Sequence, residues 1–165
     1  MNKRWSNLGV SLVLMILVVV LDQWSKWWVS QHLTLGQVVP VSSFFSLVYW
    51  VNKGAAFGVL SGAGEWGRVF LLILAGLMVV GLFIWICQLP KHQSALVLPL
   101  SLIIGGAVGN IIDRWRLSHV VDFLFFHYHR FSWPAFNVAD SFICVGVFSL
   151  LFLLFFRDNT QKLGG

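Results

Sequence analysis

Four aspartates lie within or beside strongly apolar stretches of this 165-residue chain, namely Asp22, Asp113, Asp122 and Asp140. An ionisable group at mid-bilayer costs at least about 2.5–3.5 kcal/mol, so such a group predicts a functional role. For any one of them taken singly, placement at the membrane interface is an equal alternative. As a set they suggest acid–base chemistry: two carboxylates in close contact share one proton. One can then take a proton from water while the other protonates or polarises a carbonyl.

Polar residues accompany these acids at helical spacing. Asn110 lies three residues before Asp113 and four before Arg114, so it shares a helix face with either one. Just upstream, Gly105 and Gly109 form a G-x-x-x-G pair that lets another helix approach closely. Packing explains these glycines, but it does not explain the polar residues that follow.

Asn137 and Asp140 are also three residues apart and share a face if a helix begins there. The alternative for Asn137 is a helix N-cap. If the turn before this helix folds back, Asp122 and Asp140 approach each other. That arrangement meets the chemical requirement of an aspartic peptidase.

The composition indicates that these residues are positioned by membrane helices. Hydrophobic residues make up 58% of the chain and charged residues 10%, with a mean hydropathy of +0.83. Soluble domains carry about 25% charged residues. We therefore expect an all-α membrane protein, a single domain over residues 1–165. Four stretches are suitable as spans: about 8–29, 69–89, 95–112 and 138–156.

Charge placement predicts the orientation. Lys3 and Arg4 precede the first span, and basic density is highest at the termini and near Lys91, which favours both termini in the cytoplasm.

The first stretch lacks a small-residue cleavage pattern, so it is interpreted as a retained helix. Connections of about 30–68 and 113–137 then lie outside, and the aromatic segment 38–60 favours a small β-rich element on the membrane surface.

Several other functions fit the sequence less well. The net charge of +5 is scattered among apolar stretches, whereas nucleic-acid binders cluster it, so no nucleic-acid partner is expected. Cys87 and Cys144 lie in apolar runs without Cys-x-x-Cys spacing, which favours small buried hydrophobes over a disulfide or zinc site.

Two functional alternatives are a metal-dependent protein and a transporter. His127 and His129 form a His-x-His pair, yet there is no His-Glu-x-x-His motif, so interfacial side chains are the favoured interpretation. An ion-coupled transporter would also place acids in the membrane, but the chain shows no internal repeat. A purely structural protein leaves the clustered acids and asparagines unexplained.

Five motifs, in order along nearly the whole chain, resemble bacterial lipoprotein signal peptidase. They are Leu-Asp-Gln-Trp-Ser-Lys (21–26), Asn-Lys-Gly-Ala-Ala-Phe (52–57), Gly-Asn-Ile-Ile-Asp-Arg (109–114), Val-Val-Asp-Phe (120–123) and Phe-Asn-Val-Ala-Asp (136–140). The resemblance implies four transmembrane helices and an aspartic endopeptidase of the bacterial inner membrane, with its active site toward the outer face. It implies cleavage of the signal peptide just before a diacylglyceryl-modified cysteine of a prolipoprotein.

The resemblance also implies roles for single residues. It assigns the catalytic dyad to Asp122 and Asp140, and places Asn52 and Gly54 along the substrate groove. Other polar positions would bind substrate or support the site: Asp22, Lys26, Asn110, Asp113, Arg114 and Asn137. The family needs no metal or other cofactor, works among membrane lipids and is the target of the cyclic peptide globomycin. Four spans are enough to enclose such a site in a monomer.

Overall fold

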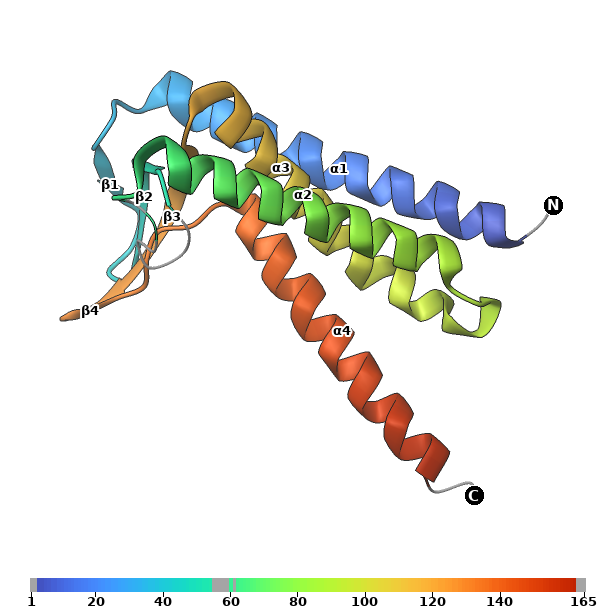
Figure 1. Cartoon of the computed structure of the whole chain (residues 1–165). Helices are drawn as coiled ribbons and strands as arrows, with labels where there is room; N and C mark the ends of the chain where they lie inside the picture. The colour runs from blue at the N-terminus through green and yellow to red at the C-terminus, as the bar shows by residue number, and fades with distance from the viewer. Residues whose placement is uncertain (1–2, 55–59, 61, 163–165) are drawn as a thin grey trace.

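The computed structural model describes residues 3–54, 60 and 62–162, with long helices lying together and a small sheet at one end (Figure 1). Within this described part, four helices are long and apolar enough to cross a membrane. They are α1 (Lys3–His32), α2 (Gly64–Gln88), α3 (Val97–Leu117), which follows the 3-10 helix η2 (Lys91–Leu96), and α4 (Val138–Lys162). The expected four membrane helices are therefore confirmed, and α1, α2 and α4 extend further than the apolar stretches alone suggested.

Helix α3 is the centre of the bundle. It packs against α1, α2 and α4, and 67% of its most apolar segment is buried, against 22% or less for the other three. Glycines permit the close approach. An added Cβ at Gly106 would lie 2.5 Å from the carbonyl oxygen of Ala139 on α4. One at Gly105 would lie 2.8 Å from Cβ of Val18 on α1, as the G-x-x-x-G pattern predicted.

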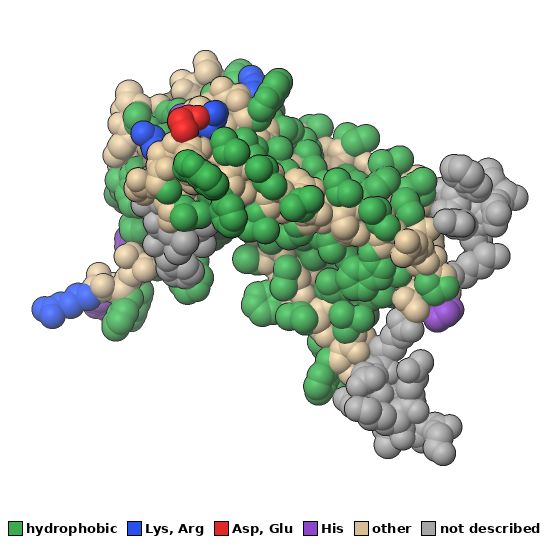
Figure 2. Space-filling model, in the orientation of Figure 1, with side chains coloured by type: hydrophobic (Ala, Val, Ile, Leu, Met, Phe, Trp, Pro, Cys, Tyr) green, Lys and Arg blue, Asp and Glu red, His purple; other side chains and the backbone are tan. Residues whose placement is uncertain are grey.

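The outer faces of the helices are apolar and uncovered by protein. Hydrophobic side chains dominate the visible helix surface, while charged ones gather toward the sheet end (Figure 2). Ile16 on α1, Leu77 on α2 and Phe148 on α4 are 61%, 67% and 74% exposed. Exposed apolar surface on this scale requires lipid rather than water. The chain is a multi-pass membrane protein.

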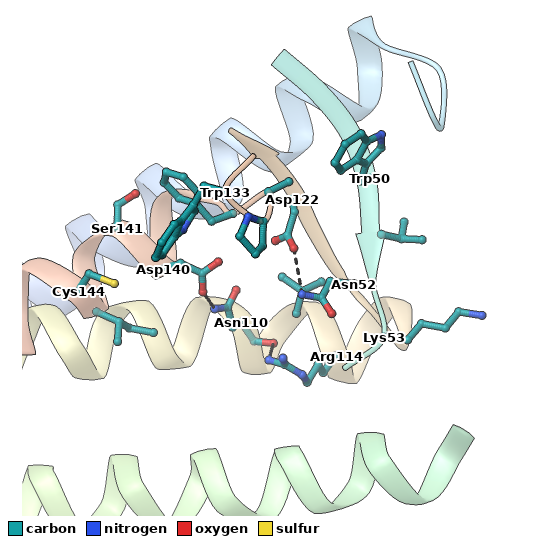
Figure 3. Close-up of a pocket in the computed structure, with 16 residues that line it drawn as sticks. Trp50, Asn52, Lys53, Asn110, Arg114, Asp122, Trp133, Asp140, Ser141 and Cys144 are labelled. Atoms are coloured by element: carbon teal, nitrogen blue, oxygen red, sulfur yellow. Dashed lines mark hydrogen bonds between the residues drawn. The ribbon is translucent and has the colours of Figure 1, made fainter. Parts of the chain in front are cut away.

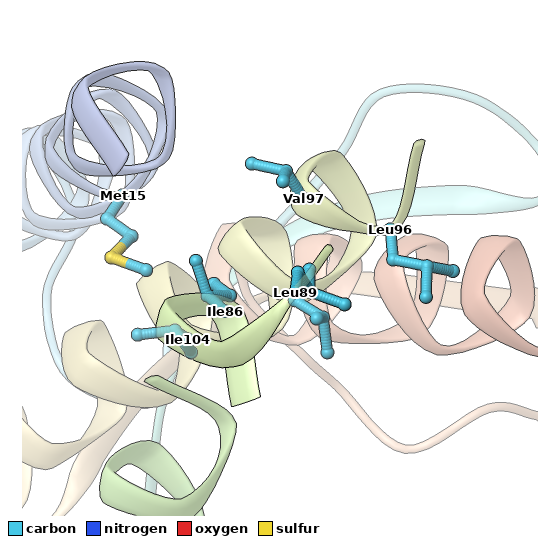
Figure 4. Close-up of a cluster of buried hydrophobic side chains, with 7 residues drawn as sticks. Met15, Ile86, Leu89, Leu96, Val97 and Ile104 are labelled. Carbon is cyan, nitrogen blue, oxygen red and sulfur yellow. The ribbon is translucent and has the colours of Figure 1, made fainter. Parts of the chain in front are cut away.

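The end of the bundle away from the sheet holds the apolar core. Seven residues form it: Met15, Ile86, Leu89, Leu96, Val97, Leu100 and Ile104 (Figure 4). Nearby, the hydroxyls of Ser11 and Ser101 lie 2.8 Å apart, and both side chains are fully buried. The beginning of α1 and the end of α4 lie at this end of the molecule (Figure 1). The other end is therefore where polar residues can gather.

A four-stranded antiparallel sheet in the order β1-β2-β3-β4 covers that other end: β1 (Val38–Pro40), β2 (Phe45–Asn52), β3 (Val120–Tyr128) and β4 (Phe131–Ser132). The first two strands come from the connection expected to be β-rich, although residues 55–59 and 61 of that segment lie outside the described residues. Strands β3 and β4 come from the second connection, which the sequence analysis did not assign to a sheet. Valines and aromatics crowd this segment, and they favour strands.

A bulge sets the register between β2 and β3. Leu47 is opposite Leu124 while Trp50 is opposite Asp122, so β2 contains one extra residue between the two pairs. Bulges re-aim side chains and are frequent beside functional sites. Here the shift puts Asn52 diagonally across from Asp122.

Replacing Gly106 by alanine should destabilise the protein, because the added methyl group meets the main chain of α4. Overpacking of this kind costs about 1–3 kcal/mol. The measurement is the thermal unfolding midpoint in detergent. Gly76→Ala in α2 is the matched control, since nothing lies within 4 Å of its added Cβ. Equal midpoints for the two variants would contradict the close α3–α4 approach.

Candidate active site

A pocket of about 820 Å³ lies where the sheet meets α3 and α4. Trp50 from β2, together with Trp133 and Phe136 from the segment before α4, contributes to an apolar wall. The polar and charged lining residues are Asn52, Lys53, Asn110, Arg114, Asp122, Asp140 and Ser141 (Figure 3). The pocket therefore combines a large apolar surface with two carboxylates that come from different elements.

Asp122 projects from β3 and is almost fully buried, with 4% of its surface exposed. Its Oδ2 accepts a hydrogen bond from Nδ2 of Asn52 (3.1 Å), and its Oδ1 accepts one from Nδ2 of Asn137 (2.9 Å). Burial, and then the nearby Asp140 carboxylate, raise the pKa of Asp122 from 3.8 to about 7, although the two amide donors oppose the shift. Asp122 is thus able to hold a proton near neutral pH.

Asp140 lies in the first turn of α4 and is half-buried. Its Oδ1 accepts a hydrogen bond from Nδ2 of Asn110 (2.8 Å), and its Oδ2 accepts one from the main-chain N–H of Asn137 (3.2 Å). The N-terminus of a helix also favours a negative charge. Both oxygens of the Asp140 carboxylate therefore accept a hydrogen bond from an N–H donor.

Asn137 connects the two carboxylates and is fully buried. Its Oδ1 accepts from the main-chain N–H of Asp140 (2.9 Å), so it caps α4, and the Asp140 side chain completes a reciprocal capping box. Its Nδ2 faces Asp122 at the same time. The N-cap role and the site role, which the sequence left as alternatives, are both present in one side chain.

A buried ion cluster lies directly behind the pocket. Nζ of Lys26 is 2.8 Å from Oδ2 of Asp22 and 2.9 Å from Oδ2 of Asp113, and all three side chains are at most 4% exposed. Oδ1 of Asp22 accepts the main-chain N–H of Ala139 (2.9 Å), and Oδ2 of Asp113 accepts that of Val121 (3.2 Å). Each buried acid therefore accepts a main-chain hydrogen bond from the residue immediately before one of the two pocket aspartates.

The same lysine orients Asn110. Nζ of Lys26 donates to Oδ1 of Asn110 (3.0 Å), and a cation on this side requires the amide oxygen to face it. Nδ2 of Asn110 then points to Asp140. Gly109 leaves room for the cluster, because an added Cβ there would lie 2.5 Å from Oδ2 of Asp22.

Arg114 ties the end of β2 to α3. Its Nη2 donates to the carbonyl of Gly54 (3.0 Å), while Oδ1 of Asn52 accepts the N–H of Gly54 (3.0 Å). Its Nη1 donates to the main-chain carbonyl of Asn110 (3.4 Å). The structure thus brings all ten residues singled out from the sequence into one connected region.

One member of this network was missed by the sequence analysis. Nε2 of Gln23 donates to Oδ1 of Asp113 (2.8 Å), to the Gly109 carbonyl (3.2 Å) and to Oδ2 of Asp22 (3.2 Å). The available signal was an uncharged amide inside an apolar span, next to Asp22.

The interpretation of Cys144 as a buried hydrophobe was wrong, because this residue is exposed and lines the pocket. Of the two histidines considered as metal ligands, His127 pairs through Nε2 with the Ser46 hydroxyl (2.9 Å), and His129 packs edge-on against Tyr128. Among the described residues, no group of three or more His, Cys, Asp or Glu side chains is placed to hold a metal ion.

The fold and the pocket together define a polytopic membrane protein with two aspartates gathered at one end of its helix bundle. Residues 14–156 match the family model described as signal peptidase (SPase) II. A lipoprotein signal peptidase of Acinetobacter baumannii is 46% identical over 150 residues, which cover 91% of this chain and 85% of that protein. The lipoprotein signal peptidase of Teredinibacter turnerae is 44% identical over 149 residues, covering 90% and 89%.

The fold also resembles solved structures of bacterial membrane enzymes. A bacterial membrane enzyme determined by the in meso method at 2.3 Å resolution superposes with a TM-score of 0.82 and 29% identity, covering 93% of this chain and 92% of that one. The chain belongs to the signal peptidase II family of membrane peptidases, and the resemblance inferred from the five motifs is confirmed.

Lys26→Met should be strongly destabilising, because it leaves the Asp22 and Asp113 carboxylates buried without their cation. Removing one partner of a buried ion pair costs about 3–5 kcal/mol. Thermal unfolding in detergent measures the loss. Glu65→Gln is the control, since this acid is 74% exposed and pairs with Arg68 at the surface, where a pair contributes at most about 1 kcal/mol. Adding Asp113→Asn to Lys26→Met should recover part of the loss, and no recovery would argue against charge as the cause.

Proposed function

We propose that this protein is an aspartic endopeptidase that removes the signal peptide from diacylglyceryl-modified prolipoproteins by cutting on the N-terminal side of the lipidated cysteine. Its relatives carry the name lipoprotein signal peptidase. The observation that carries the proposal is the convergence of Asp122 and Asp140 on one pocket, linked by Asn137. The apolar lining suits a substrate that arrives from the bilayer with acyl chains attached.

The two carboxylates have different surroundings, and we assign their roles from that difference. Asp140 accepts two N–H donors at a helix N-terminus and is only half-buried, so we assign it the role of the base. Asp122 is buried and its pKa is raised to about 7, so it carries the shared proton. A matched acid and base of this kind are what peptide hydrolysis by water requires.

The chemical steps follow from this assignment. Asp140 takes a proton from water as the water oxygen bonds to the scissile carbonyl carbon, and Asp122 gives its proton to the carbonyl oxygen. The resulting tetrahedral intermediate breaks its C–N bond as Asp140 passes the proton to the departing nitrogen. Asp122 recovers its proton from the intermediate's hydroxyl. The cycle restores both groups and uses no metal.

The supporting residues keep this geometry. Lys26 orients Asn110, which donates a hydrogen bond to Asp140. Asn52 and Asn137 each donate a hydrogen bond to Asp122. In our proposal Gly54 and Asn52 border the path of the peptide, beside the pocket wall. The apolar wall is also where a globomycin-type peptide inhibitor would bind.

The proposed placement is the bacterial inner membrane. Both helical termini would face the cytoplasm, where Lys3 and Arg4 suit the positive-inside rule. The sheet and pocket would then lie at the outer face. A lipid-modified cysteine sits at the membrane surface, so its scissile bond would meet the pocket at that depth. The two aspartates and their hydrogen-bond partners all come from one chain, which supports a monomer.

Asp122→Asn and Asp140→Asn should each lower kcat about 10³-fold or more, since loss of either member of a catalytic pair removes most of the rate. The assay is cleavage of a diacylglyceryl-modified prolipoprotein by purified protein in detergent or lipid. Glu65→Gln, which removes an exposed acid outside the pocket, should keep full activity. Unfolding midpoints near that of the wild type show that the variants are folded. Full activity in either folded asparagine variant would refute the dyad.

Activity should fall as the pH rises above about 7, because Asp122 must hold its proton and loses it through that range. The hydrogen bond from Asn52 lowers the pKa of Asp122. Asn52→Ser, whose hydroxyl can still support the turn at Gly54, should therefore move the alkaline limb of kcat/KM to higher pH. The measurement is a pH profile of wild type and variant. A limb that stays in place or moves to lower pH would contradict the assignment of the proton to Asp122.

A further inference from the structure

Strands β3 and β4 form a hairpin that extends away from the helix bundle on the same side as α4 (Figure 1). His129 and Arg130 make its two-residue turn, between the pair Tyr128 and Phe131. His129 has a φ of 52°, the left-handed conformation that tight hairpin turns require. The turn therefore completes a short ribbon that projects beyond the helix bundle.

One face of this hairpin is entirely aromatic. Tyr128 is opposite Phe131, and the same register continues to Trp133, whose main-chain N–H donates to the carbonyl of Phe126 (2.9 Å). Because paired residues share a face and alternate residues along a strand do too, all four aromatic side chains lie on one side. Phe126, Tyr128, Phe131 and Trp133 are 41%, 67%, 81% and 61% exposed.

Side chains on the opposite face of the hairpin strand β3 contact side chains of β2. His127 pairs with Ser46 of β2, and the ring of Phe125 lies 4.8 Å from that of Trp50. At the base of the aromatic face, Phe126 packs against Phe45 and Phe136. The hairpin is thus held in position by β2, while Tyr128 and Phe131 near its turn stay largely exposed.

The charge of the segment has one sign. Residues 123–139 contain no acid, and Arg130 lies exposed at the turn beside His129. Tyrosine and tryptophan rings prefer the level of the lipid headgroups. A basic side chain at that level is attracted by anionic lipids. Both properties occur together at the end of the molecule where the membrane helices meet the sheet.

We propose that this interfacial hairpin, residues 126–133, rests its aromatic face among lipid headgroups and that Arg130 recognises an anionic phospholipid. Trp133 also lines the pocket. Contact of the hairpin with the leaflet would therefore hold one wall of the pocket at the depth of the lipid headgroups. The inference depends on the membrane helices and the exposed hairpin, not on the peptidase chemistry, so failure of one leaves the other standing.

The test uses the full chain in nanodiscs, with Tyr128 replaced by an environment-sensitive fluorescent aromatic amino acid. Brominated phosphatidylcholine, with or without phosphatidylglycerol, quenches the probe if the hairpin lies in the interface. Quenching should be stronger with phosphatidylglycerol. Arg130→Gln should shift the ratio of inserted to withdrawn hairpin by roughly fivefold, which corresponds to about 1 kcal/mol per basic residue near an anionic surface.

Arg116→Gln is the matched control, because it removes another exposed arginine, from the last turn of α3 rather than from the hairpin. It should leave the phosphatidylglycerol-dependent quenching unchanged. Weak quenching in both lipids would overturn the interfacial placement. Equal quenching in both lipids that Arg130→Gln leaves unchanged would overturn the anionic recognition. A probe that responds only when a prolipoprotein peptide is added would overturn the proposal in favour of substrate as the occupant.

Discussion

The rest of the structure depends on a single buried positive charge. Nζ of Lys26 on α1 contacts Asp22 on its own helix and Asp113 on α3, and none of the three side chains is more than 4% exposed. The two acids reach onward to the main chain of Val121 and Ala139, the residues just before the pocket aspartates. The buried ammonium group of Lys26 therefore has two carboxylate partners. Through their main-chain contacts, these carboxylates fix β3 and α4 relative to α1.

This constraint divides the molecule into two ends. Away from the sheet, α1, α2 and α3 close on an apolar cluster that needs no polar partners. Toward the sheet, small residues bring the helices close enough for side chains to reach across. Gly109 leaves space for Asp22, and Gly106 brings α3 against α4 at Ala139. Close packing and the polar contacts therefore use the same stretch of α3.

The sequence predicted the set of membrane helices, because apolar length and composition control it. It also predicted that Asp122 and Asp140 approach each other if the turn before α4 folds back. It did not predict β3 and β4, because Val120 to Tyr128 contains both strand-forming residues and the Asp122 motif, and only the motif was considered. The sequence also did not predict the bulge opposite Asp122, or the main-chain donors Ala139 and Val121 that Asp22 and Asp113 contact. Such contacts join segments far apart in the chain, whose spacing leaves no mark in a single sequence.

Two chemically identical carboxylates become different through the elements that carry them. Asp122 comes from a strand and is buried near the Asp140 carboxylate, so its neutral form is favoured even though two amide side chains donate to it. Asp140 comes from a helix N-terminus, meets a main-chain N–H and remains half-buried. Asn137 contacts both, so neither carboxylate can shift without disturbing the cap of α4. The asymmetry between the two carboxylates therefore comes from the strand and the helix N-terminus that carry them.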